Sequence, residues 1–206
     1  MEPPTPSPPT KWQADPSNPI PTRGGNVLTL PLCGPQDQRP VQDVHAKDIA
    51  PFSTAPLTTP LFIHGEVLVN VGVSSSAKDT DVHAKLMDVY PTGETMLLVD
   101  GVVRMRGRGG VYSETFFPPL RPGQVYNVTV SLGWFSYIIT QGHALRLDLS
   151  SSNFPRFSVN PNTGEPISNN STPPVIATNS VYHDTSYPSS LLLPLFDLGD
   201  AQLKWL

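Results

Sequence analysis

Five histidines and a single cysteine are the side chains that could serve this 206-residue chain as bases, metal ligands or nucleophiles. The histidines are scattered, and no His-x-x-x-His or Cys-x-x-Cys spacing indicates a zinc site. Cys33 precedes Gly34-Pro35 in a predicted loop, and no neighbouring residue would activate it, so we interpret it as an inert thiol. No serine has glycines on both sides at the Gly-x-Ser-x-Gly spacing of a nucleophile elbow.

Two other groupings could also do chemistry. His183-Asp184 pairs an imidazole with a carboxylate, but adjacent strand residues point to opposite faces, which favours a structural role. Asp79, Asp81 and Asp88 could bind Ca²⁺, but they are sparse, and capping of turns is the usual role of such aspartates. We therefore expect no metal, no cofactor and no catalytic residue in this chain.

The elements that would position these side chains are predicted to be short strands. Residues 62–73 carry Val67, Val69, Val71 and Val73 in strict alternation with other residues, which predicts a core strand. Residues 79–106 are predicted to form three strands, joined by turns at 91–93 and at Asp100-Gly101. In this stretch His83 and Lys85 lie on the polar face, and Arg104, Arg106 and Arg108 are interpreted as a solvated strand face.

Further strands are predicted near residues 49–53, 126–132, 145–149, 175–182 and 190–196, and no segment has sustained helical periodicity. Such strands need a second sheet to cover their apolar faces. The predicted fold class is therefore all-β, a jelly-roll β-sandwich with little helix. Trp134, Phe135 and Tyr137 are either a binding platform or core and interface filler, and we favour the second reading.

Composition supports one domain of this kind. The chain has 25 prolines and a net charge of -4, so it offers no basic surface for nucleic acid. One cysteine excludes an intrachain disulfide. Because neither a signal peptide nor an apolar run of membrane-spanning length is visible, we expect no membrane partner and a cytoplasmic location by default.

We assign residues 1–22 to a Pro-rich, extended, linker-like segment, 23–198 to the sandwich and 199–206 to a tail. Gly24-Gly25 permits a sharp bend or a close backbone approach.

Several motifs then follow one another in a recognisable order. They are Asp15-Pro-Ser-Asn-Pro-Ile-Pro-Thr-x-Gly-Gly25, Gly34-Pro-Gln-Asp-Gln-Arg-Pro-Val41, Ala84-Lys-Leu-x-Asp-Val-Tyr-Pro91, Asp100-Gly-Val-Val-Arg-Met-Arg106, Ser150-Ser-Ser-Asn-Phe-Pro-Arg-Phe157 and Asn160-Pro-Asn-Thr-Gly164. Together they resemble the C-terminal jelly-roll domain of the Xaa-Pro dipeptidyl-peptidase, cocaine esterase and alpha-amino-acid ester hydrolase class of serine hydrolases. The resemblance covers about residues 14 to 197.

This resemblance implies a partner and a role. In the family a Ser-Asp-His triad lies on a separate α/β-hydrolase domain, and nothing in this sequence matches that domain. No residue here, including His143 and His183, inherits a triad role, and the chain alone is predicted to be inactive. The resemblance implies packing on the α/β-hydrolase domain, with Val27, Leu28 and Thr29 in the wall of the substrate pocket. The alternative is that Val27 and Leu28 are simply core residues.

Two other functions stay open. Jelly rolls of this kind resemble galactose-binding domains, so the chain could be a free-standing carbohydrate- or ligand-binding module, with Trp134, Phe135 and Tyr137 as its stacking surface. It could also be a truncated product. In that case an exposed apolar docking patch would cause self-association.

Overall fold

The computed structural model describes residues 7–27, 33–109, 118–165 and 171–196, and these are nearly all strand and loop. Nine strands are found in this described part, with one short α-helix, α1 (Arg39–Val44), and two single turns of 3₁₀ helix at Ala46–Asp48 and Met105–Gly107. The strands are β1 (Thr10–Ala14), β2 (Ala50–Ser53), β3 (Leu61–Ser75), β4 (Asp81–Val89), β5 (Thr95–Arg104), β6 (Tyr126–Ile139), β7 (Ala144–Ser150), β8 (Ala177–Tyr182) and β9 (Ser190–Leu192).

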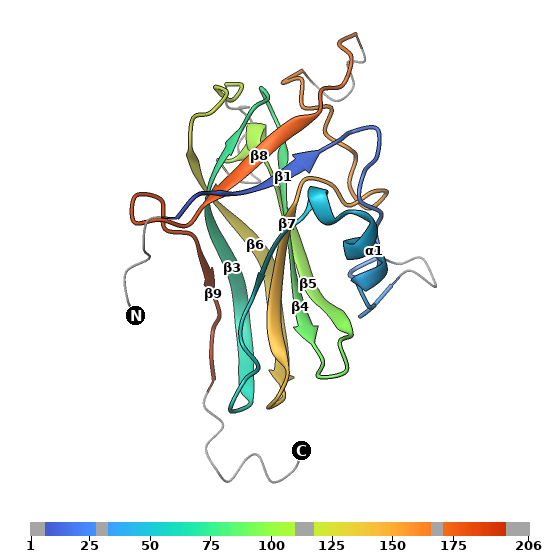
Figure 1. Ribbon diagram of the computed structural model, residues 1–206, viewed down its shortest axis with the longest axis vertical. Helices are drawn as coiled ribbons and strands as arrows, with labels where there is room; N and C mark the ends of the chain where they lie inside the picture. The colour runs from blue at the N-terminus through green and yellow to red at the C-terminus, as the bar shows by residue number, and fades with distance from the viewer. Residues whose placement is uncertain (1–6, 28–32, 110–117, 166–170, 197–206) are drawn as a thin grey trace.

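These strands form two antiparallel sheets that pack face to face (Figure 1). One sheet has the order β1-β8-β3-β6, with β9 also paired to β3, and the other has the order β2-β7-β4-β5. From β1 to β8 the chain crosses to the other sheet at every step except the β4–β5 hairpin. This double Greek-key order is that of a jelly roll and confirms the predicted fold class.

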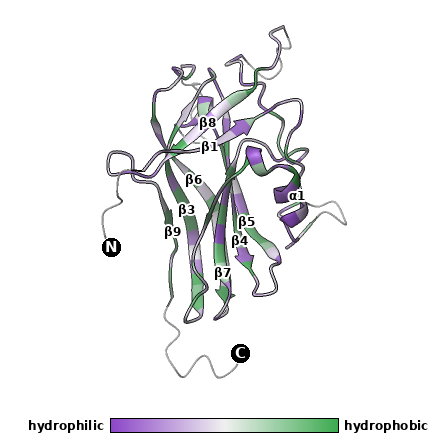
Figure 2. Ribbon diagram, in the orientation of Figure 1, coloured by the Kyte–Doolittle hydropathy of each residue, from purple (hydrophilic) through white to green (hydrophobic). Residues whose placement is uncertain are grey.

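The core lies between the sheets. Val67, Val69, Val71 and Val73 of β3 are at most 4% exposed, as their alternation predicted. They face the inward side chains of β4 and β7, among them Leu86 and Leu149. Figure 2 shows hydrophobic stretches along the strands of both sheets and hydrophilic residues on α1.

The stretch 79–106 differs from its prediction. It forms two strands, β4 and β5, and the expected turn at Pro91-Thr92-Gly93 joins them. The expected turn at Asp100-Gly101 is wrong, because both residues lie inside β5. A Cβ atom on Gly101 would lie 2.1 Å from the Ser131 carbonyl oxygen of β6. The glycine therefore serves a close approach of two backbones from opposite sheets rather than a hairpin.

The N-terminal segment also contributes to the sandwich. Within residues 1–22, which we predicted to be a linker, Thr10–Ala14 form β1 and pair with β8. Trp12 is 1% exposed, and its indole N–H donates to the Ser151 hydroxyl at 2.9 Å. The tail that we assigned to residues 199–206 lies outside the described residues. No helix in the described ranges has the length and apolarity that crossing a membrane requires.

Candidate functional site

The outer face of the four-stranded sheet is covered, and polar side chains are buried beneath this cover. The prediction that His83 and Lys85 lie on an exposed face is wrong, since they are 2% and 6% exposed. The His83 ring packs edge-on against Phe157, with ring centroids 5.3 Å apart. Alternation along β4 correctly separated two faces but could not show that distant segments fold over the polar one. Burial, together with the nearby Lys85 charge, lowers the pKa of His83 to about 3.

Lys85 is held beneath the segment that leads into α1. Its ammonium group donates to the Gln38 side-chain oxygen at 3.3 Å, and the Gln38 amide nitrogen donates to the carbonyls of Arg23 and Gln36. Burial lowers the pKa of Lys85, while the nearby Asp100 and Asp148 carboxylates oppose that shift. Gln38 therefore ties β4 to two separate stretches of backbone.

A second anchor is the ion pair of Asp100 and Arg156. The Arg156 Nη1 atom lies 2.5 Å from the Asp100 carboxylate, and the Asn153 amide donates to the same carboxylate at 3.1 Å. The Asp100 side chain is 4% exposed and that of Arg156 is 19% exposed. The Arg156 guanidinium also lies over the Phe157 ring, 5.0 Å from its centroid. The pair joins β5 to the segment that follows β7.

A loop base rests on this anchor. The Gly25 N–H donates to the Gly34 carbonyl at 2.8 Å, and the Gly34 N–H donates back to Gly25 at 3.1 Å. A Cβ atom on Gly24 would lie 2.5 Å from the Gly34 oxygen, and one on Gly25 would lie 3.1 Å from Asp100 Oδ1. The close backbone approach expected of Gly24-Gly25 is thus confirmed. We call the paired Gly25 and Gly34, with residues 23–24 and 35–38, the loop base.

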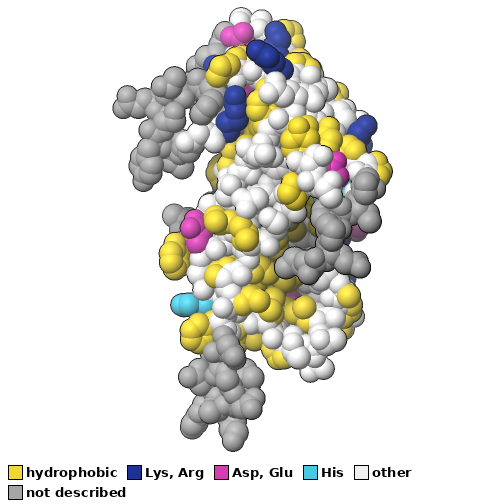
Figure 3. Space-filling view, turned by 90° about the vertical axis from the view of Figure 1, so that its left-hand side faces the viewer, with side chains coloured by type: hydrophobic (Ala, Val, Ile, Leu, Met, Phe, Trp, Pro, Cys, Tyr) yellow, Lys and Arg dark blue, Asp and Glu magenta, His cyan; other side chains and the backbone are white. Residues whose placement is uncertain are grey.

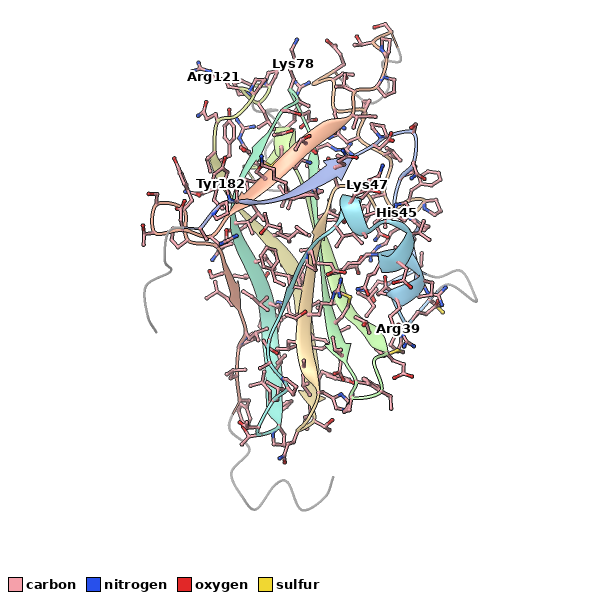
Figure 4. All side chains as sticks on the ribbon, viewed as in Figure 1. Arg39, His45, Lys47, Lys78, Arg121 and Tyr182 are labelled. Atoms are coloured by element: carbon pink, nitrogen blue, oxygen red, sulfur yellow. The ribbon has the colours of Figure 1, made fainter. Side chains whose placement is uncertain are left out.

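The second arm of the loop base runs along β5. The Leu97 N–H donates to the Gln36 carbonyl at 3.1 Å, and the Gln38 N–H donates to the Thr95 carbonyl at 2.8 Å. The Asp37 carboxylate accepts the Thr95 N–H at 3.1 Å and the Arg39 Nε at 2.8 Å. Figure 4 shows Arg39 and His45 at the two ends of α1, beside this sheet. The backbone after the loop is therefore fixed to β5, and the backbone before the loop is held to it through the Gly25–Gly34 pair.

The residues predicted to wall a substrate pocket lie in the chain between the two parts of this base. Val27 is half-buried, and its N–H donates to the Gly25 carbonyl at 2.9 Å. Leu28 and Thr29 lie outside the described residues. The pocket-wall role of Val27, Leu28 and Thr29 therefore stays a prediction, as does its core alternative.

The remaining candidates have structural partners. His183 contacts the hydroxyls of Ser7 and Thr10, whereas Asp184 accepts the backbone N–H groups of Ser186 and Tyr187. The two side chains thus serve different partners, but both residues follow the end of β8, so the alternation of strand residues is not the reason.

The three aspartates are likewise divided. Asp79 and Asp81 both accept from the Asn160 amide, and Arg104 pairs with Asp81 at 2.7 Å. Asp88 instead contacts His143 at 2.8 Å, a pairing between residues 55 apart that no local motif could reveal. In the ranges that the structure describes, no group of three or more His, Cys, Asp or Glu side chains could hold a metal ion.

The three aromatic residues of β6 do not form one surface. Trp134 is 82% exposed, whereas Phe135 and Tyr137 stack on one another at 5.7 Å and pack against the core. Alternation along the strand places Trp134 and its two neighbours on opposite faces. A combined stacking platform of the three is therefore wrong, and core filling holds for Phe135 and Tyr137.

A jelly roll that fixes a loop by backbone pairing and by the partly buried Asp100–Arg156 ion pair has the arrangement of a supporting scaffold. Comparison with known families agrees with this class. The chain belongs to the family of X-Pro dipeptidyl-peptidase C-terminal non-catalytic domains, whose model matches residues 2–192.

Individual relatives are hydrolases of greater length. The cocaine esterase of Rhodococcus sp. (strain MB1 Bresler) is 38% identical over 185 residues, which are 88% of this chain and 31% of the esterase. An aminopeptidase from a marine sediment Thaumarchaeota archaeon superposes with a TM-score of 0.82 at 25% identity, covering 95% of this chain and 34% of that one. An alpha-amino acid ester hydrolase superposes with a TM-score of 0.79 at 28% identity, and the match covers 91% of this chain and 32% of that one. The chain thus spans about a third of the length of these relatives.

Proposed function

We propose that this chain is the non-catalytic C-terminal domain of a serine hydrolase that cleaves ester or peptide bonds. In this proposal it packs on an α/β-hydrolase catalytic domain and helps to wall the substrate pocket. The family membership and the hydrolase names of the relatives support the class of reaction. The observation that carries the proposal is the loop base, where Gly25 pairs with Gly34 and lies against Asp100 and Arg156.

The physical argument concerns rigidity. Burying ionised side chains costs desolvation free energy, so a buried pair adds little net stability compared with apolar packing. The contacts here instead hold the chain in place on each side of residues 26–33. The Asp100–Arg156 pair lies against Gly25 before the loop, and Lys85 donates to Gln38 after it. A side chain that shapes a substrate pocket must be held within about 0.5 Å by its supporting residues. In this proposal the loop base gives such support to Val27, Leu28 and Thr29, which lie in the chain between its two parts.

The first test asks whether the chain catalyses anything alone. We expect no turnover of p-nitrophenyl esters or Xaa-Pro p-nitroanilides by the pure chain. Turnover that a serine-directed inhibitor abolishes would contradict the non-catalytic assignment.

The second test asks whether the loop base acts on catalysis. The chain replaces the C-terminal third of the cocaine esterase relative, and ester hydrolysis by the chimera is compared with that of the truncated esterase. We expect activity to require the chain, and Gly25→Ala to lower kcat/KM because Gly25 has a φ of +82° and close neighbours. Gly107→Ala is the matched control, since nothing lies within 4 Å of a Cβ atom there. Equal kcat/KM for the two variants would refute the role of the loop base.

A further inference from the structure

A cavity of about 260 Å³ opens between the two sheets on the side where β2 and β7 face β8 and β9. The other side of the sandwich is closed, because Gly101 of β5 lies directly against Ser131 of β6. The sheets therefore separate toward β2 and β9. Figure 3 faces the side of β9 and shows hydrophobic side chains gathered on its lower half, with few charged groups among them.

The wall of the cavity is apolar. Its inner part is made by side chains that alternate inward along β3 and β7, and β8, β9 and β2 complete it. These residues are Val69, Val71, Leu145, Leu147, Leu149, Val181, Leu191 and Phe52. Among the residues that the structure describes, no Asp, Glu, Lys or Arg lines the cavity. A space of this kind is expected to be dry, because water needs two or more polar partners in a cavity.

The cavity also has polar lining residues, and three of them are exposed to solvent. Ser53, Thr54 and Ser190 line it and are exposed, so they form its rim. His183 also lines the cavity, with its ring edge-on to Phe52 at 6.1 Å and its two nitrogens engaged by Ser7 and Thr10. The rim therefore offers hydroxyl groups, while the interior offers only hydrocarbon.

The size and lining define the class of ligand. A cavity of about 150 Å³ lined by aliphatic and aromatic side chains binds benzene, so the larger volume here suits roughly two fused rings. A charged molecule is excluded, because an unpaired charge in an apolar site has a large desolvation cost. We propose that this inter-sheet cavity is a binding site for a small neutral aromatic molecule with one hydroxyl or carbonyl end directed at the rim.

This site is separate from the loop base. The cavity is lined by Leu147 and Leu149 on the inner face of β7, whereas the loop base pairs with the edge strand β5 of the same sheet and contacts Lys85 on its outer face. The proposal therefore does not rest on the hydrolase assignment, and either can fail alone.

The test uses the full chain with 2-naphthol as the probe. Calorimetric titration is expected to give saturable binding with one site per chain. Leu191→Trp should fill the cavity and weaken 2-naphthol binding at least tenfold. Leu192→Trp is the matched control, because Leu192 is the next residue of β9, is 47% exposed and does not line the cavity. It should leave the affinity unchanged.

Two results would overturn the proposal. One is the absence of saturable binding up to the solubility limit of 2-naphthol. The other is equal affinity in the Leu191→Trp and Leu192→Trp variants, which would place the probe elsewhere on the chain. Circular dichroism checks that each variant folds. If Leu191→Trp does not fold, the smaller change Leu191→Phe serves, with an expected loss of affinity relative to Leu192→Phe.

Discussion

Gly101 offers the sharpest test of how the two sheets meet. In Gly101→Ala the new methyl group would lie 2.1 Å from the Ser131 carbonyl oxygen and 3.0 Å from its carbon. Overpacking of a core costs about 1–3 kcal/mol, and here the obstacle is backbone that cannot rotate away. We therefore expect a loss of about 3 kcal/mol in the free energy of unfolding. For a domain of this size that corresponds to a fall in Tm of about 6–12 °C.

Urea unfolding followed by circular dichroism measures this loss. Gly107→Ala is the matched control, because its Cβ atom would meet no heavy atom within 4 Å and its φ is not left-handed. It should change the unfolding free energy by less than about 0.5 kcal/mol. A loss below about 1 kcal/mol in Gly101→Ala, with an unchanged m-value, would refute the close approach of β5 and β6.

Two further predictions concern the covered face of the four-stranded sheet. Asp100→Asn leaves the partly buried Arg156 guanidinium without its carboxylate partner and should cost about 2 kcal/mol in urea unfolding, less than for a fully buried pair, and Asp100→Asn with Arg156→Met should partly restore this loss. A smaller loss in the single variant than in the double one would contradict this. His83 has its pKa lowered from 6.5 to about 3 by burial, so between these values the unfolded chain binds a proton that the folded chain does not. The unfolding free energy should therefore fall as the pH drops from 6.5 toward 3, by up to about 1.4 kcal/mol per pH unit, and His83→Phe should flatten this slope. Equal slopes in the wild type and the variant would rule out His83 as the titrating group.

Much of the fold could be predicted because its signals are local. The alternation of valines in β3 specifies a strand with one buried face, and the structure shows that strand. The turn at Pro91-Thr92-Gly93 depends on residues within the turn itself, and it was predicted correctly. Gly24-Gly25 was assigned to a bend or close approach, and Gly34 proved to be the partner that it approaches.

The errors have a common physical cause, which is that the deciding contact is distant in sequence. Asp100-Gly101 has the composition of a hairpin turn. In the structure, however, Asp100 forms an ion pair with Arg156, and Gly101 leaves room for the Ser131 carbonyl of the other sheet. Lys85 alternates like a solvent-facing side chain, yet Gln38 covers it from 47 residues away. A local pattern distinguishes the two faces of a strand but does not say which long connection will fold over one of them. The loop base was therefore visible only through its glycines and through family resemblance.

The register of β4 against β7 links the loop base to the cavity. Lys85 lies opposite Asp148 and Leu86 lies opposite Leu147 in this antiparallel pair. Asp148 accepts the Gln42 amide from α1 on the outer face, while Leu147 lines the cavity on the inner face. Because side chains alternate with a period of two, a slip of one residue would place the charges in the core and the leucines under α1. The buried polar contacts of the outer face thus select the same register that keeps the inter-sheet cavity apolar.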